Sequence, residues 1–221
     1  MAVITISREF GSGGDEIAAR VCDLLQYRFF DKRLMVEVAA EVGLCESEVV
    51  DFSEDRYEVR SFLTRVLRAG PRTVATVYAW EEDTSGRKTL TERQLNAAQC
   101  AELVRHTVLA AYKQGDVVIL GRGGQAILRD KPGALHVRVI APLPVRMEKL
   151  RQQGMSGIAE MKLQINEKDR ATAEYVQRFH GVQWDDPDLY DLVINTARLD
   201  IESAARAIAT LVEHIKAAPV G

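Results

Sequence analysis

Three glycines and an arginine lie close together near the start of the chain, in the stretch SREFGSGGDE at residues 7–16. The glycines, Gly11, Gly13 and Gly14, allow a tight turn in which several backbone N–H groups point at one spot. A helix is expected directly after them, and the positive end of a helix favours an anion. The chemistry predicted here is phosphate binding, and a strand-to-helix turn without a ligand stays open as the alternative.

The usual cation of a phosphate-binding loop is missing from this stretch. The common loop ends in Gly-Lys-Ser/Thr, whereas here two glycines are followed by Asp15 and Glu16. Both are ordinary first-turn residues of a helix, but they repel a phosphate unless a cation lies between. Arg8 is the nearest side chain that can replace the lysine, because its planar guanidinium suits phosphate oxygens. The alternative for Arg8 is a surface ion pair with Glu9 or Glu16.

A second glycine-rich loop, GRGG at residues 121–124, follows the apolar segment VVIL. A continuous apolar segment of this kind is typical of a strand that is buried on both faces of a parallel sheet. Arg122 comes directly after that strand and is placed to bind a phosphate. A structural arginine that ties loops together is the alternative.

Both loops need a sheet that brings them to one edge. Short apolar segments alternate with amphipathic ones along the chain, which predicts an α/β fold with a parallel sheet flanked by helices. Such sheets bind ligands at the carboxyl ends of their strands, where the loops after Ile6, Phe30 and Leu120 are expected. One long helix is predicted from a Thr91 cap to Gly115, and a polar helical stretch over about 156–180.

Composition is that of an ordinary protein of one domain, with 221 residues, a net charge of −3 and 47% hydrophobic residues. No apolar run approaches the ~18 residues that a membrane span needs. Three widely spaced cysteines, Cys22, Cys45 and Cys100, fit a reducing compartment. We therefore expect a cytoplasmic protein that binds neither nucleic acid nor a membrane. A homodimer through the helices between Ser53 and Gly115 stays open.

Five segments, in this order, together resemble the cytidylate kinase-like family, a branch of the P-loop nucleoside monophosphate kinases. They are ITISREFGSGGDEIA, YRFFDKRLM, VVILGRGGQAIL, INEKDRATAEYVQRFHG and YDLVINTARLDIE. The resemblance implies a three-layer P-loop kinase fold in a single domain over residues 1–221. It also implies a helical acceptor-side insertion at about 36–90 and a lid at about 152–182.

The resemblance further implies transfer of the terminal phosphoryl group of ATP to a nucleoside monophosphate such as CMP, or to a related small acceptor, with Mg²⁺ bridging phosphate oxygens. The residues implied for the ATP phosphates are Gly11, Ser12, Gly13, Gly14, Asp15 and Glu16. The residues implied for the acceptor are Asp31, Arg33 and Arg122. The lid residues implied are Lys168, Asp169 and Arg170, which close over the phosphates.

Candidate catalytic cations on this interpretation are Arg8, Arg122 and Arg170. No metal ligand is assigned, and Glu16, aligned with the hydroxyl residue that holds Mg²⁺ in relatives, is the candidate contact for that ion.

Departures from ordinary cytidylate kinases, seen when the loop is aligned with theirs through Gly-Ser-Gly, bear on activity. Gly14 takes the position of the catalytic lysine, and Gly123 that of the aspartate in the Gly-Arg-Asp acceptor loop. Thr172 stands where many relatives have a lid arginine, which leaves Arg170 and Arg178 as replacements. Two other functions therefore stay open. One is a nucleotide- or phosphate-binding regulatory module without turnover, and the other is a kinase of a non-nucleotide small molecule.

Overall fold

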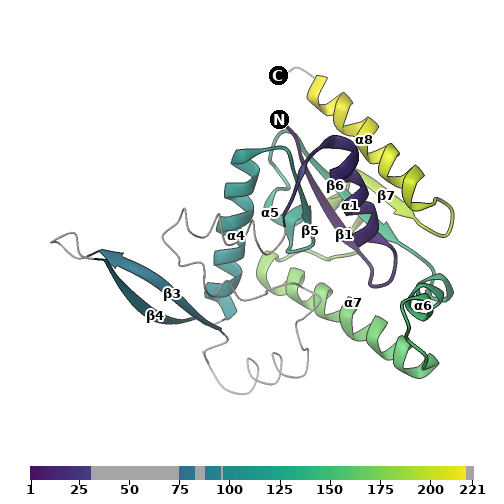
Figure 1. Ribbon diagram of the computed structural model, residues 1–221, viewed down its shortest axis with the longest axis horizontal. Helices are drawn as coiled ribbons and strands as arrows, with labels where there is room; N and C mark the ends of the chain where they lie inside the picture. The colour runs from purple at the N-terminus through teal and green to yellow at the C-terminus, as the bar shows by residue number, and fades with distance from the viewer. Residues whose placement is uncertain (31–74, 83–87, 96, 218–221) are drawn as a thin grey trace.

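A five-stranded parallel sheet forms the centre of the protein, in the strand order β2–β5–β1–β6–β7 (Figure 1). The computed structural model describes residues 1–30, 75–82, 88–95 and 97–217. The strands of the sheet are β1 (Val3–Arg8), β2 (Arg28–Phe29), β5 (Val117–Leu120), β6 (Ala134–Ile140) and β7 (Leu192–Asn195). The predicted α/β fold with a parallel sheet is confirmed.

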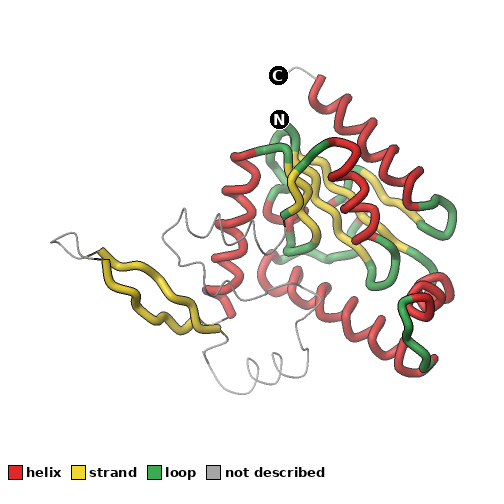
Figure 2. The backbone as a smooth tube through the Cα atoms, in the orientation of Figure 1, coloured by secondary structure: helices red, strands yellow, loops and turns green. Residues whose placement is uncertain are grey.

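Helices cover both faces of this sheet (Figures 1 and 2). Successive residues of a strand point to opposite faces, so each strand contributes to two cores. On one face Ile4 and Ile6 pack with the helices α1 (Gly14–Leu25) and α8 (Ile201–Ala217). On the other face Val3 packs with α4 (Ala97–Gln114), next to the short helix α5 (Gly124–Ile127). This arrangement, a parallel sheet between two layers of helices, has the three layers that the resemblance implied.

Two further helices lie near the carboxyl ends of the strands. Helix α6 (Leu143–Gln152) follows β6 and has a proline in its first turn, where the missing N–H costs nothing. Helix α7 (Ile158–His180) is one continuous helix that ends at Gly181, a residue with a φ of 70°. A short 3-10 helix, η3 (Pro187–Leu189), precedes β7. Among the described helices, none has the length and apolar character that crossing a membrane requires.

An antiparallel hairpin replaces part of the helix that the sequence predicted. The strands β3 (Ala75–Glu82) and β4 (Lys88–Leu95) pair along their full length and extend away from the sheet (Figure 1). The predicted start of a helix at Thr91 is therefore wrong, because that residue lies in β4 and α4 begins six residues later, at Ala97. The partner strand supplies hydrogen bonds that local periodicity does not reveal.

The helical insertion predicted at about 36–90 is only partly covered by the described residues. Its residues up to 74 lie outside them, and the described part, 75–82 and 88–90, is strand rather than helix.

Candidate phosphate-binding site

The loop between β1 and α1 has the geometry of an anion site. Gly11 and Gly13 have φ angles of 78° and 90°, which residues with a side chain rarely adopt. Within the described part of the chain, the backbone N–H groups of Gly13, Gly14, Asp15 and Glu16 have no hydrogen-bond partner. N–H groups of this kind at the start of a helix, added to the helix dipole, form a cradle for a phosphate.

Arg8 lies over Gly14, the position at which the common loop carries its lysine. A Cβ atom on Gly14 would come within 2.4 Å of the Cβ and 2.7 Å of the Cγ of Arg8. The guanidinium of Arg8 reaches the carboxylate of Asp15, with Nη2 and Oδ1 3.3 Å apart. The Arg8 side chain is 9% exposed. The alternative of a surface pair with Glu9 or Glu16 is therefore corrected in its partner, which is Asp15, and in the burial of Arg8.

A lysine that sequence reasoning missed lies over the neighbouring glycine. The Nζ atom of Lys149, from α6, is 2.9 Å from Oε1 of Glu16. A Cβ atom on Gly13 would come within 2.6 Å of that Nζ atom. Glu16 is therefore paired with a cation, and counting along the phosphate-loop signature puts Asp15 rather than Glu16 directly after the lysine position. No local pattern marks Lys149, because its partner lies on a different helix far away in sequence.

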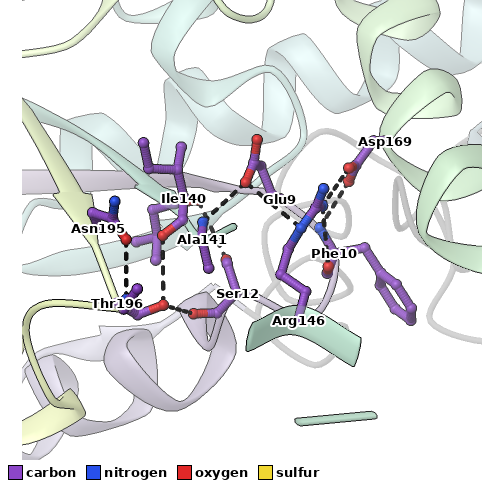
Figure 3. A network of polar contacts seen from close by, with 11 residues as sticks. Glu9, Phe10, Ser12, Ile140, Ala141, Arg146, Asp169, Asn195 and Thr196 are labelled. Atoms are coloured by element: carbon purple, nitrogen blue, oxygen red, sulfur yellow. Dashed lines mark hydrogen bonds and ion pairs between the residues drawn. The ribbon is translucent and has the colours of Figure 1, made fainter. Parts of the chain in front are cut away.

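Side chains from α6 and α7 hold the backbone of the loop (Figure 3). The N–H of Phe10 donates to Oδ1 of Asp169 at 2.8 Å, and the carbonyl of Phe10 accepts from Nη1 of Arg146 at 3.4 Å. The same Nη1 donates to Oδ2 of Asp169. Glu9 accepts from the N–H of Ala141 at 3.0 Å. Asp169, a predicted lid residue, thus contacts the phosphate loop, and Arg146 is a second residue that sequence reasoning missed.

The hydroxyl groups near the loop serve its backbone. Thr196, just after β7, donates from Oγ1 to the carbonyl of Ser12 at 2.7 Å (Figure 3). Ser12 is buried and donates its own hydroxyl to the carbonyl of Val139 at 3.3 Å. The side chain of Ser12 therefore fixes the loop against β6.

The second glycine-rich loop lies at the same edge of the sheet. Arg122 is buried, with a φ of 60° that non-glycine residues seldom adopt, and its guanidinium lies 5.6 Å from the centre of the Phe30 ring. Gly123 leaves room for a histidine, because a Cβ atom there would come within 2.5 Å of Nε2 of His180. An imidazole thus lies beside the position at which the family pattern has an aspartate.

Of the other two predicted lid residues, Lys168 lies near the loop, whereas Arg170 binds a residue of its own helix. The Nζ atom of Lys168 lies 5.9 Å from the centre of the Phe10 ring. The side chain of Arg170 is 69% exposed and binds Glu174 on the same helix, with Nε and Oε1 2.6 Å apart. Among the described residues Arg170 has no other partner, so the structure does not bring it to the phosphate loop.

The acceptor residues and the metal are the remaining parts of the predicted site. Asp31 and Arg33, predicted to face the acceptor, lie outside the described residues. Over the described ranges, no group of three or more His, Cys, Asp and Glu side chains could hold a metal ion. A Mg²⁺ ion would therefore depend on phosphate oxygens of a nucleotide plus one or two carboxylates, which is how Mg²⁺ commonly binds in kinases.

A pocket of about 470 Å³ opens beside the loop, between α6 and the turn that follows β7. Gly11, Ser12, Lys149 and Thr196 line its end at the loop. The partly exposed apolar residues Val145 and Leu199, from the two sides, also line it. The remaining lining residues are Pro144, Glu148, Gln152, Asp200 and Ile201. An apolar-sided pocket next to an anion cradle suits a flat ring that carries phosphates.

Comparison with known proteins finds one matching family and several relatives that are cytidylate kinases. The sequence profile of the cytidylate kinase-like family matches residues 3–198. A cytidylate kinase of Methanothermobacter thermautotrophicus is 30% identical over 103 residues, which cover 47% of this chain and 62% of that protein. A cytidylate kinase of Haloarcula marismortui is 22% identical over 199 residues, which cover 90% of this chain and 82% of that protein.

The matches to several of these relatives are partial. The chain spans 62%, 57% and 60% of the length of three of the cytidylate kinases that it matches. Among solved structures, an uncharacterized protein from Eubacterium ventriosum has a TM-score of 0.62 at 16% identity, covering 96% of this chain and 99% of that one. That likeness concerns the fold alone.

Proposed function

The chain belongs to the cytidylate kinase-like family, and we propose that it transfers the terminal phosphoryl group of ATP to a nucleoside monophosphate, CMP or a close relative. The observation that carries this proposal is the position of Arg8 over Gly14, beside a cradle of N–H groups that have no partner among the described residues. Phosphoryl transfer needs little covalent chemistry from a protein and depends on positioning and on neutralising charge. Arg8 supplies a fixed cation next to position 14, where the common phosphate-binding loop has its lysine.

The ATP phosphates fit the cradle at the start of α1, and the base fits the adjoining pocket between Val145 and Leu199. The loop backbone is already held in shape, because Asp169 and Arg146 bind the peptide of Phe10 from outside. A preformed cradle reduces the reorganisation that binding and reaction require.

Magnesium is proposed to bind together with the nucleotide, since the described residues offer no group of three or more His, Cys, Asp and Glu side chains that could hold the ion. Bound to the phosphates, Mg²⁺ would neutralise part of the charge that develops during transfer. Asp15 and Glu16 belong to the cradle itself, and the carboxylate of each is already bound to a cation, Arg8 or Lys149. These pairs support a site in which two positive and two negative side chains surround the proposed position of the phosphates.

The acceptor would be bound on the side of the second loop. Arg122 offers a planar fork that suits the two oxygens of a monophosphate. His180 beside Gly123 supports a further candidate, a kinase of a non-nucleotide small molecule, since an imidazole replaces the aspartate of the family pattern there. Asp31 and Arg33 remain proposed acceptor residues, and Lys168 and Arg170 proposed lid residues.

A nucleotide-binding module without turnover is the second candidate. The observation that favours it is the pairing of Arg8 with Asp15, which reduces the charge that Arg8 can offer to a transition state. On this alternative ATP raises the melting temperature but is not consumed.

An ADP-release assay with Mg²⁺ and a panel of nucleoside monophosphates and small metabolites tests these alternatives. We expect release with at least one nucleotide acceptor, and a loss of about 100-fold or more in kcat/KM in Arg8→Met, as expected when a preorganised donor is removed. Arg206→Met is the control, because Arg206 is exposed on α8 and pairs with Glu202, and neither residue lines the pocket. ATP-dependent stabilisation without ADP release from any acceptor would establish the binding module instead.

A further inference from the structure

We infer that Lys149 is a second phosphate-binding cation of this site, and that Glu16 holds its ammonium group in place until a nucleotide binds. This inference rests on the proposed binding of ATP to the loop between β1 and α1. It adds a residue from α6 to a site whose predicted members come from the loop itself, the second loop and α7.

The position of the ammonium group is the first observation. The space that a side chain at position 13 would fill holds the Nζ atom of Lys149, 2.6 Å from where a Cβ atom of Gly13 would be. The N–H of Gly13 is one of the cradle groups without a partner among the described residues. Lys149 therefore brings a positive charge to the edge of the cradle, and the absence of a side chain at Gly13 is what admits it.

The second observation is a repeated arrangement on the two sides of the loop. Arg8 lies over Gly14 and binds Asp15, while Lys149 lies over Gly13 and binds Glu16. Two consecutive glycines thus each admit a cation, and two consecutive acidic residues each hold one. At an anion site, a carboxylate that is paired with a cation takes the position that a bound anion would have. An incoming phosphate therefore competes with the carboxylate for the cation.

The two cations differ in how readily they can exchange partners. The side chain of Arg8 is almost fully buried, at 9% exposed, whereas that of Lys149 is 24% exposed and its partner Glu16 is 44% exposed. A lysine ammonium has three donors on a flexible stem, so it can turn from a carboxylate to a phosphate without a backbone movement. Lys149 is therefore the cation that responds to the nucleotide, and Arg8 is the fixed one.

The placement of α6 indicates which phosphates Lys149 meets. Arg146, three residues earlier on the same helix, binds the peptide of Phe10 and Asp169, so α6 is fixed against the loop. Lys149 also lines the pocket proposed for the base, together with Thr196 at the loop end. A cation between that pocket and the cradle is placed to contact the phosphates nearest to the nucleoside.

Titration calorimetry on the full chain tests this role without relying on turnover, with ATP and with adenosine as probes and in EDTA or with Mg²⁺. For Lys149→Met we expect ATP affinity to fall at least tenfold, while adenosine affinity changes less than twofold. For Glu16→Gln we expect ATP in EDTA to bind several-fold more tightly, because the lysine no longer has a competing carboxylate. Arg206→Met, on the exposed side of α8 and paired with Glu202, is the control and should match the wild type.

Three outcomes would overturn the inference. ATP binding to Lys149→Met at wild-type affinity would show that the lysine does not contact phosphate. An equal loss of ATP and adenosine affinity would show that it shapes the base pocket instead. If the wild type binds no ATP, the proposed function fails and the inference fails with it. If the wild type binds ATP and Arg8→Met binds it more weakly while Lys149→Met does not, the inference alone fails.

Discussion

The side chain of Arg8 leaves no room for a side chain at Gly14: a Cβ atom on Gly14 would lie 2.4 Å from the Cβ of Arg8. Contacts this short are not found between real side chains, and the atom concerned is fixed to the backbone of Arg8 rather than being the end of a flexible chain. An arginine at position 8 and a lysine at position 14 are therefore mutually exclusive in this loop. The lack of a lysine at position 14 and the presence of a side chain at position 8 are therefore structurally linked.

The hydrogen bonds that Asp169 and Arg146 make to the backbone of Phe10, here called the clamp on Phe10, should contribute measurably to stability. Asp169→Ala removes the acceptor of the Phe10 N–H and the closest anion of the buried Arg146. We expect a loss of about 2 kcal/mol in the free energy of unfolding, below the ~3–5 kcal/mol of a fully buried pair, because Glu9 lies 3.8 Å from Arg146. Urea denaturation measures the loss.

Arg170→Ala, one residue along the same helix, is the control for this clamp. Its side chain is exposed and pairs only with Glu174 among the described residues, so the urea midpoint should stay close to that of the wild type. An Asp169→Ala protein as stable as this control would contradict the clamp.

Much of the fold could be predicted because it is encoded locally. The alternation of apolar and amphipathic segments indicates the parallel sheet, and the glycines after β1 indicate the anion site. Lys149, Arg146 and His180 were missed because each acts on a loop that lies far away in sequence, and no spacing rule connects them. The hairpin was missed for the same reason, since the pairing of Thr91 with Ala79 outweighs the helical pattern around it.

Position 123 should tolerate no side chain while His180 is present. Gly123 has a φ of 66°, and a Cβ atom there would come within 2.5 Å of the imidazole Nε2. We expect Gly123→Ala to lower the free energy of unfolding by about 1–3 kcal/mol, as overpacking of a well-packed interior does.

The same substitution in a His180→Ala background isolates the contact. Its cost should be about 1 kcal/mol smaller there, because only the backbone strain remains. Equal costs in the two backgrounds, measured by urea denaturation, would refute the contact.

Stability should fall as the solution becomes mildly acidic. Burial lowers the pKa of His136, whose ring binds Thr5 and the carbonyl of Leu128, and burial also lowers the pKa of His180. Between these lowered values and about 6.5, the unfolded chain binds more protons than the folded one. The contribution of the two neutral histidines to the free energy of unfolding is therefore fully present above about pH 6.5. It is lost as the pH falls below that value, by at most about 1.4 kcal/mol per pH unit for each histidine.

Urea denaturation at pH 7.5, 6.5 and 5.5 checks this dependence. His136→Gln should flatten it, whereas His106→Gln, on the exposed surface of α4 and paired with Glu102, serves as the control. An unchanged slope in both His136→Gln and His180→Gln would rule out these two groups as its source.

Exchanging the side chains at positions 8 and 14 tests most directly whether Arg8 replaces the missing lysine in function. The measurement is ATP affinity and kcat/KM for Arg8→Gly, for Gly14→Lys and for the double variant that carries both changes. We predict a loss of about 100-fold in Arg8→Gly, a destabilised protein for Gly14→Lys, and a double variant that recovers to within about tenfold of the wild type. A double variant no better than Arg8→Gly alone, or an Arg8→Gly protein with wild-type affinity and rate, would contradict the account.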